Sequence, residues 1–359
     1  MRVLQIAPPW FTVPPERYGG TELVVAGLVD RLVATGHDTT LVASGGSSTR
    51  GRVRTIYRTP PSAELGDAVV ELPHVLAGYR LRHGFDIVHD HTVTGIGVGA
   101  LLDGPPLVHT VHGAWVPALA RLYAAVADRV NLVAISQDHA ARAPADVALS
   151  GVVHNGIEVE RYPLGTGTGG YLAWLGRAGA DKGADIAVEI AGRLRLPLRM
   201  AMKVSEAAEH RWWQEILLPM LPGTDTVVVH NATHGQKVAL LAGARALLFP
   251  IRWDEPFGLA MIEANACGTP VVAFARGAAP ELVDDGHSGF LVAPDDLDAM
   301  AAAASEVPRL DRHACRTNVE RRFTAARMTA GYLRLFERLI PTRTIRLPEV
   351  GRSPPGQAP

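Results

Sequence analysis

The sequence is poor in cysteine, has no excess of basic charge and contains no long uncharged apolar stretch. Two cysteines, Cys267 and Cys315, are too few for a disulfide scaffold or a cysteine metal cluster, so we expect a reducing, cytoplasmic environment. The net charge of -1 argues against a general nucleic-acid binder, which needs a basic excess. No uncharged run reaches the ~18 residues of a membrane span, and the apolar run before Pro8 is too short for a signal peptide.

The chain is long enough, and contains enough apolar residues, to form a folded core. Its 359 residues suit two domains of about 150–200 residues each. A composition of 47% hydrophobic and 20% charged residues is typical of globular proteins and excludes a disordered chain.

Short apolar runs alternate with helical patterns, which predicts doubly wound parallel sheets. The expected strands cover residues 3–7, 39–43, 86–89, 107–111, 131–135 and 152–154, then 171–175, 198–203, 226–230, 246–250 and 271–274. Thr21 is the expected N-cap of the first helix, which Gly36 closes. Further helices are expected over residues 185–194, 236–242 and 258–266.

A glycine-rich stretch, Gly156–Gly170, is the most linker-like part of the chain. We therefore expect a Rossmann-like domain over residues 1–160 and a second one over 161–320. An amphipathic helix within 321–340 needs an apolar partner and is expected to pack back toward the N-terminal domain. The tail, 341–359, is expected to be flexible. The crevices of two such sheets can face each other, so a ligand would bind between the domains.

The most informative segment runs from residue 253 to 272. Pro256 suits the opening of a helix, and the backbone N–H groups of Gly258 and Leu259 would then form an anion site at its positive end. Glu263 follows Gly258 by five residues, roughly 7.5 Å along the helix axis. That is about the distance from a nucleotide's phosphate to its ribose hydroxyls, which a carboxylate accepts. The alternative is a solvated helix glutamate.

Two glycine-containing loops follow strands. In the loop that ends at Gly183, Arg177 and Lys182 could neutralise one diphosphate, or they are simply surface cations on a turn. Only three lysines occur in the chain, which favours a specific role for Lys182. In the loop before the first helix, Gly19 and Gly20 allow a ligand close to the backbone; a plain turn is the alternative. This loop is not GxGxxG, which counts against a dehydrogenase.

These segments together resemble a family-4 retaining glycosyltransferase of the GT-B fold. Nearly the whole chain carries the resemblance, and the most specific motifs are Gly176-Arg177 with Lys182-Gly183, and Glu255 and Glu263 in the spacing E-x7-E. The other matching segments are Gly19-Gly20, Asp86–His91, Thr110–Gly113, Ala134–Ser136 and Val153–Ile157.

The resemblance implies a role for each matched residue. The catalytic residues would be His112, Arg177, Lys182 and Glu255. Arg177 and Lys182 would hold the diphosphate of a nucleotide sugar, and Glu263 its ribose. The sugar and phosphates would contact Glu255, Phe257, Gly258 and Leu259. Gly19 and Gly20, in the other domain, would close on the phosphates. His112 would touch the transferred sugar.

Two departures from the family pattern concern the donor. Lys203-Val-Ser replaces a glycine-rich turn, and Val229–Ala232 replaces the usual Phe-x-Gly. Both lie where the base and sugar should bind, so the donor stays open between a UDP-sugar and a GDP-sugar.

No metal and no cofactor is expected. His89-Asp90-His91 is interpreted as a poor ligand cluster because its side chains should point to opposite faces of a strand. For His91 we expect a structural or substrate-contact role. The pairs Asp284-Asp285 and Asp295-Asp296 are typical of turns and helix caps.

The function that follows is a bacterial retaining glycosyltransferase that transfers a sugar to an acceptor by a metal-independent, front-face mechanism. The acceptor is left open between a glycan, a lipid and a small metabolite. No nucleic acid is expected as partner, and membrane contact is left open. The alternatives are a GT-B nucleotide-sugar epimerase, whose site would need an activated water and several histidines, and a non-catalytic nucleotide-binding module.

Overall fold

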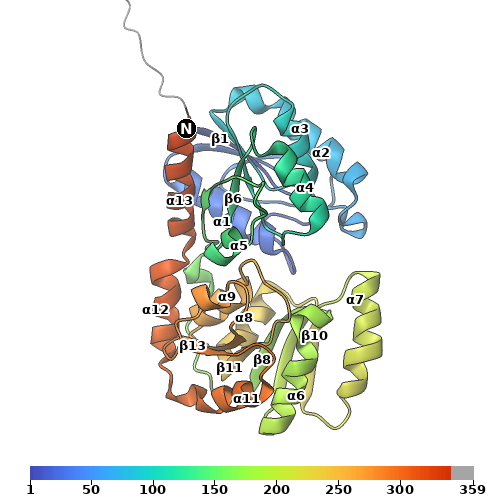
Figure 1. Ribbon diagram of the computed structural model, residues 1–359, viewed down its shortest axis with the longest axis vertical. Coiled ribbons are helices and arrows are strands. Elements are labelled where there is room, and N and C mark those ends of the chain that lie inside the picture. The colour runs from blue at the N-terminus through green and yellow to red at the C-terminus, as the bar shows by residue number, and fades with distance from the viewer. Residues whose placement is uncertain (341–359) are drawn as a thin grey trace, which may run out of the picture.

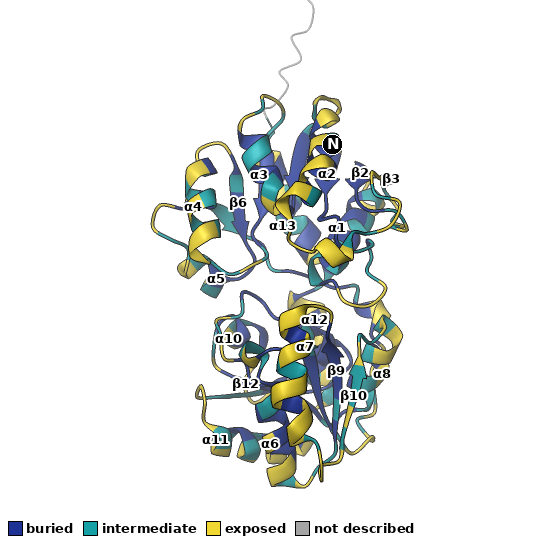
Figure 2. Ribbon diagram, turned by 90° about the vertical axis from the view of Figure 1, so that its right-hand side faces the viewer, coloured by how far each residue is buried: buried dark blue, intermediate teal, exposed yellow. Residues whose placement is uncertain are grey.

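The computed structural model describes residues 1–340, which form two α/β domains stacked along the long axis of the molecule (Figure 1). The prediction of a flexible tail over residues 341–359 lies outside the described residues. Each domain contains a parallel sheet whose strands are largely buried, with helices on both faces (Figure 2). The predicted fold class, two doubly wound parallel sheets facing across a cleft, is confirmed.

The first sheet has the strand order β3-β2-β1-β4-β5-β6-β7. Its strands are β1 (Arg2–Ile6), β2 (Asp38–Val42), β3 (Arg52–Arg54), β4 (Ile87–Asp90), β5 (Leu107–Thr110), β6 (Asn131–Ala134) and β7 (Leu149–Val152). Its helices are α1 (Gly20–Ala34), α2 (Ala68–Arg80), α3 (Val93–Ala100), α4 (Pro117–Val126) and α5 (Gln137–Ala141). The order reverses between β1 and β4, so the loop after β1 opens at the switch point where ligands bind in such sheets.

The second sheet has the order β10-β9-β8-β11-β12-β13. Its strands are β8 (Leu172–Arg177), β9 (Leu198–Lys203), β10 (Thr226–His230), β11 (Ala246–Phe249), β12 (Val271–Phe274) and β13 (Gly289–Val292). The helices are α6 (Ala184–Leu194), α7 (Ala207–Trp212), α8 (His234–Gly243), α9 (Leu259–Ala266), α10 (Ala279–Leu282), α11 (Leu297–Glu306) and α12 (Arg312–Arg322). The switch point lies between β8 and β11, so the loops after these strands face the first domain.

The last helix, α13 (Ala325–Leu339), packs against the first domain beside α1 (Figure 1). Its buried residues Met328, Tyr332 and Phe336 share an apolar cluster with Val24 and Leu28 of α1. The stripe of large apolar residues in this helix therefore has its partner in the N-terminal sheet and its covering helix.

Three local expectations were wrong. Helix α1 begins at Gly20 rather than after Thr21, because Gly19 is the N-cap and its positive φ of 147° turns the chain into the helix. The glycine run within Gly156–Gly170 is not a free linker, since the N–H of Gly165 donates to the carbonyl of Cys267 at 2.9 Å. Strand β7 lies at Leu149–Val152, three residues before the expected start.

No helix within residues 1–340 is both long enough and apolar enough to cross a membrane.

Candidate functional site

A cleft of about 450 Å³ lies between the two domains, at the carboxyl ends of both sheets. The N-terminal domain contributes the loop after β1, the first turn of α1 and His112, and the C-terminal domain contributes the ends of β8 and β9 and the loop before α9. All ten residues proposed from the sequence line this cleft. They are Gly19, Gly20, His112, Arg177, Lys182, Glu255, Phe257, Gly258, Leu259 and Glu263.

The starts of two helices from different domains meet in the cleft. A Cβ atom added to Gly20, at the start of α1, would lie 3.3 Å from the Cδ1 atom of Leu259, at the start of α9. The N-cap residues are glycines, Gly19 and Gly258, and no side chain of residues 1–340 caps either helix. Backbone N–H groups and the positive ends of two helix dipoles therefore face one space, which is an arrangement that binds anions.

Helix α9 begins later than the sequence predicts. Pro256 precedes its first residue, Leu259, by three positions and does not open it. The chain instead turns at Gly258, whose φ of 96° lies in the left-handed region that favours glycine. A Cβ atom there would lie 2.5 Å from the Cε atom of Met261, the end of a flexible side chain that can move, so the positive φ rather than the packing favours glycine.

The two predicted phosphate-binding cations face the cleft with carboxylate partners. Arg177, at the end of β8, donates to Asp181 at 2.6 Å. Lys182 forms an ion pair with Glu255, and its ammonium group lies 4.6 Å from the ring centre of Trp253. The expected diphosphate cations are thus held in place by acids of the same domain, and Glu255 is positioned beside Lys182 by this pair.

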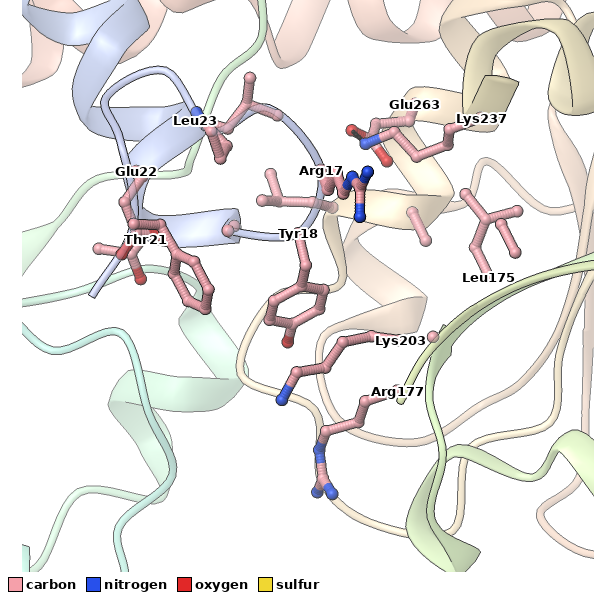
Figure 3. Close-up of a pocket in the computed structure, with 18 of the residues that line it drawn as sticks. Arg17, Tyr18, Thr21, Glu22, Leu23, Leu175, Arg177, Lys203, Lys237 and Glu263 are labelled. Atoms are coloured by element: carbon pink, nitrogen blue, oxygen red, sulfur yellow. Dashed lines mark hydrogen bonds and ion pairs between the residues drawn. The ribbon is translucent and has the colours of Figure 1, made fainter. Parts of the chain in front are cut away.

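A third cation, Lys203, was missed as a site residue. It ends β9 directly beside Arg177, with which it is in register, and both side chains extend below Tyr18 in Figure 3. Lys203 is buried, and its Nζ donates to Glu209 at 2.8 Å and to Glu206 at 2.6 Å. The sequence offered one signal, because Lys203 stands where the family usually has a glycine-rich turn.

Glu263 is buried in the wall of the cleft. It forms an ion pair with Lys237, as Figure 3 shows at the upper right, and it accepts a hydrogen bond of 2.8 Å from the hydroxyl of Tyr162. Both contacts are made by the same oxygen, Oε1. The alternative of a solvated glutamate is therefore wrong, because α9 packs beside α8 against β11 and β12 and this side chain is turned inward.

A second buried carboxylate in the cleft, Glu22, was also missed. It lies in the first turn of α1, and burial raises its pKa to about 7. It belongs to the same loop motif as Gly19 and Gly20, but exposed glutamates are common in the first turn of helices, and nothing in the sequence marked this one as buried.

His112 is half-buried at the edge of the cleft, and its Nε2 lies 2.9 Å from the Nδ1 of His91. Burial, followed by the nearby His139, lowers the pKa of His112 to about 3, so the imidazole is neutral. The expectation that the side chains around Asp90 point to opposite faces was wrong for the two histidines. Positions two apart on a strand share a face, and the ring centres of His89 and His91 are 4.1 Å apart.

Within residues 1–340, no group of three or more His, Cys, Asp or Glu side chains is arranged to hold a metal ion. His89 and His91 are instead buried below the cleft, hydrogen-bonded to neutral side chains.

Two Rossmann-like domains that face each other across such a cleft define the GT-B class of folds. The Anabaena protein HepE, solved in complex with UDP and glucose, has this fold too: it aligns with a TM-score of 0.73, over 94% of this chain and 99% of that chain, at 18% sequence identity. Residues 18–161 match the family model described as Glycosyltransferase Family 4, and residues 169–308 match Glycosyl transferases group 1. The two matches together cover more than half of the chain, which belongs to this family of glycosyltransferases.

Curated relatives match over shorter stretches. A glycogen synthase from Mycobacterium tuberculosis is 33% identical over 183 residues, which cover 49% of this chain and 42% of that protein. An MMP alpha-(1->4)-mannosyltransferase from Mycolicibacterium hassiacum is 31% identical over 264 residues, which cover 64% of this chain and 62% of that protein. The chain thus spans about half the length of the curated relatives that it matches.

Proposed function

We propose that this protein transfers a sugar from a nucleoside-diphosphate sugar to an acceptor, with retention of configuration and without a metal ion. The observation that carries the proposal is the meeting of two uncapped helix starts, Gly20 and Leu259, beside Arg177 and Lys182. A diphosphate placed there would receive backbone N–H groups from both domains and charge from the two side chains. Such a site stabilises the negative charge that develops as the diphosphate departs.

Two carboxylates of the cleft form ion pairs, as a front-face reaction without a protein nucleophile would allow. Glu255 is paired with Lys182, and Glu263 is paired with Lys237. Neither is a free carboxylate of the kind that attacks the sugar in retaining glycoside hydrolysis, where two carboxyl groups flank the bond. In the proposed mechanism the departing phosphate itself accepts the proton of the acceptor hydroxyl, on the face where that hydroxyl attacks.

The two domains contact each other on the side of α5. Glu281 of α10 accepts hydrogen bonds from the backbone N–H groups of Gln137 and Asp138, at 2.8 and 2.5 Å. Arg142 of the first domain donates to Asp254 of the second at 2.7 Å. We propose that these contacts form and break as the domains close on the donor and open to release the product.

The donor is proposed to be a UDP-sugar or a GDP-sugar. The likeness to HepE, whose structure contains UDP and glucose, supports a nucleotide at this place. The names of the curated relatives, a glycogen synthase and a mannosyltransferase, support sugar transfer as the reaction and leave the acceptor open. Two buried, unpaired cysteines, Cys267 and Cys315, support a location in the reducing cytoplasm.

The test is a panel of UDP- and GDP-sugars, first by thermal shift and then by turnover. A ligand that binds only the folded protein raises its melting temperature. We expect one nucleotide series to stabilise the protein, and one sugar of that series to be transferred or slowly hydrolysed with release of the nucleoside diphosphate. Release of an epimerised free sugar without acceptor would instead show an epimerase. Binding of nucleotides with no turnover of any donor or acceptor would show a binding module.

A further inference from the structure

A continuous row of hydrogen bonds leads from the cleft into the core of the N-terminal domain. It begins at His112, whose Nε2 lies 2.9 Å from the Nδ1 of His91. The other ring nitrogen of His91, Nε2, lies 2.9 Å from the Oε1 of Gln5. Gln5 and His91 are buried in β1 and at the end of β4, so the row passes beneath the floor of the cleft.

A second branch leads from Gln5 away from the cleft. The Nε2 of Gln5 lies 3.2 Å from the Nδ1 of His89, and the Nε2 of His89 lies 2.8 Å from the hydroxyl of Thr110. That hydroxyl is in turn 2.7 Å from the hydroxyl of Tyr332 on α13. Gln5 therefore joins two branches, one toward the cleft and one toward the last helix.

The amide of Gln5 fixes the direction of every bond in the cleft branch. Its Oε1 can only accept, so the proton of His91 lies on Nε2. Burial, and then the neighbouring histidines, hold the pKa of His91 well below its usual value, so this imidazole carries one proton only. The Nδ1 of His91 is consequently an acceptor, and the proton of the shared bond belongs to the Nε2 of His112. His112 then has an unprotonated Nδ1, to which no residue within 1–340 donates.

We propose that Gln5, acting through His91, is a positioning residue that fixes His112 as the Nε2–H tautomer and presents its Nδ1 to the cleft as a hydrogen-bond acceptor. This inference rests on the proposed function, in which the transferred sugar lies beside His112. The group recognised there is a hydroxyl that donates its hydrogen to Nδ1. A donor sugar with a deoxy position or a fluorine at that place lacks the hydrogen and loses the contact.

Two substitutions of His91 separate the two ring nitrogens. Asn places its amide near the position of Nδ1, so His91→Asn keeps a partner for His112 but loses the bond to Gln5, and its amide can then accept from His112 or donate to it. Gln reaches the position of Nε2, so His91→Gln keeps the bond to Gln5 and leaves His112 without an acceptor. Tyr332→Phe is the matched control, because it removes the last bond of the branch toward α13 at an equally buried position and leaves Thr110 to accept from His89.

The first measurement needs no substrate. In protein labelled with nitrogen-15 at histidine, spectra that correlate ring nitrogens with carbon-bound protons distinguish the two tautomers, and His112→Gln identifies the signal. We expect His112 to be the Nε2–H tautomer in the wild type and in Tyr332→Phe. We expect a mixture of tautomers in both His91 variants, and also in Gln5→Met, which serves if the His91 variants do not fold. A wild-type His112 protonated on Nδ1 would overturn the proposal.

The second measurement is turnover of the donor found for the wild type. We expect kcat to fall about tenfold in His91→Gln, the size of one lost hydrogen bond, while KM changes less than twofold. Tyr332→Phe should keep kcat within about twofold. A kcat within twofold of the wild type in both His91→Gln and Gln5→Met would overturn the positioning role. If the wild type transfers no sugar, the proposed function fails, and the tautomer spectra alone decide the role of Gln5 and His91.

Discussion

The carboxylate of Glu263 holds Lys237 and Tyr162 with one oxygen and leaves the other to the cleft. Its Oε1 pairs with the ammonium group of Lys237 and accepts the Tyr162 hydroxyl at 2.8 Å. No residue within 1–340 donates a hydrogen bond to Oε2, although the side chain is only 5% exposed. A carboxylate oxygen that lines a ligand cleft and keeps its lone pairs is suited to accept the hydroxyls of a ribose.

The first prediction therefore concerns Glu263→Gln. We expect the affinity for the matching nucleoside diphosphate to fall by about 1–2 kcal/mol, because charged hydrogen bonds to the ribose become neutral ones. Binding of the 2′,3′-dideoxy analogue should barely change. The free energy of unfolding should fall as well, by about 1–3 kcal/mol, since Lys237 loses its buried partner. Calorimetric titration and urea unfolding measure the two effects.

Tyr162→Phe is the control for this experiment. It removes the other bond to Oε1 and should lower stability by about 1 kcal/mol, without changing the discrimination between the natural and the dideoxy ligand. If Glu263→Gln weakens both ligands equally, the carboxylate is not on the ribose, and its role is to hold Lys237 and Tyr162 in the wall of the cleft.

The second prediction concerns the diphosphate. Arg177→Ala should lower kcat/KM for the donor by about 1.5–3 kcal/mol, because a charge-assisted contact is lost. Lys182→Ala should lower it at least as much, since Glu255 then also loses its ion-pair partner. Stability should change little in Arg177→Ala, because the ion pair with Asp181 is partly exposed to solvent. Steady-state kinetics with the donor varied measures these effects.

Arg252→Ala provides the matched control for these cations. Arg252 pairs with Asp185 at 2.7 Å and donates to the carbonyl of Ala180, on the same loop region, but it does not line the cleft. Donor kinetics should stay within about twofold in this variant. Unchanged donor kinetics in both Arg177→Ala and Lys182→Ala would show that these side chains do not bind the diphosphate.

Much of the cleft could be predicted from short motifs because of how parallel sheets are built. Loops after the strands of such a sheet all open at its carboxyl edge, so Gly19, Arg177 and Leu259 meet although they are far apart in the chain. The expected strands 198–203, 226–230 and 271–274 have the predicted bounds. They lie in apolar runs with clear limits. The strand β3 was missed, because Arg52-Val53-Arg54 at the sheet edge carries no apolar run.

What the sequence could not predict are contacts that depend on packing between distant segments. Glu263 meets Tyr162, 101 positions earlier, only because the segment that follows the first domain packs against α9. Lys203 is buried because Glu209 of α7 folds back over β9. His91 and Gln5 touch because β1 and β4 are neighbours in the sheet. No local sequence pattern predicts these pairings, so charged and polar residues could only be interpreted one at a time.

The third prediction concerns metal ions. We expect sugar transfer to survive incubation with EDTA followed by removal of the chelator, because Arg177, Lys182 and the two helix starts supply the positive charge that a metal would otherwise provide. The measurement is the initial rate before and after chelation, with added magnesium or manganese as a further condition. Complete loss of activity that either ion restores would show that the aspartates were misinterpreted.

The last prediction concerns Glu22, whose pKa is raised by burial from 4.5 to about 7. Between these values the folded protein keeps a proton that the unfolded chain releases, so stability falls as the pH rises through this window. The loss amounts to roughly 3 kcal/mol at and above pH 7, at 1.36 kcal/mol per pKa unit. Glu22→Gln removes this loss. The difference in free energy of unfolding between variant and wild type should therefore favour the variant increasingly from pH 5 to pH 8.

Donor binding should follow the same titration. A diphosphate at the start of α1 would lie beside Glu22 and favour its neutral form, so wild-type affinity for the nucleoside diphosphate should fall relative to Glu22→Gln as the pH rises above 7. Other groups titrate in the same range: the ligand does, and burial also raises the pKa of Asp90 to about 7. Because variant and wild type share these groups, comparing the two proteins at each pH cancels their contribution. Urea unfolding and calorimetric titration at pH 5, 6, 7 and 8 test both effects. Parallel curves for the two proteins would mean that Glu22 is already ionised in the fold, held by the N-terminal end of α1.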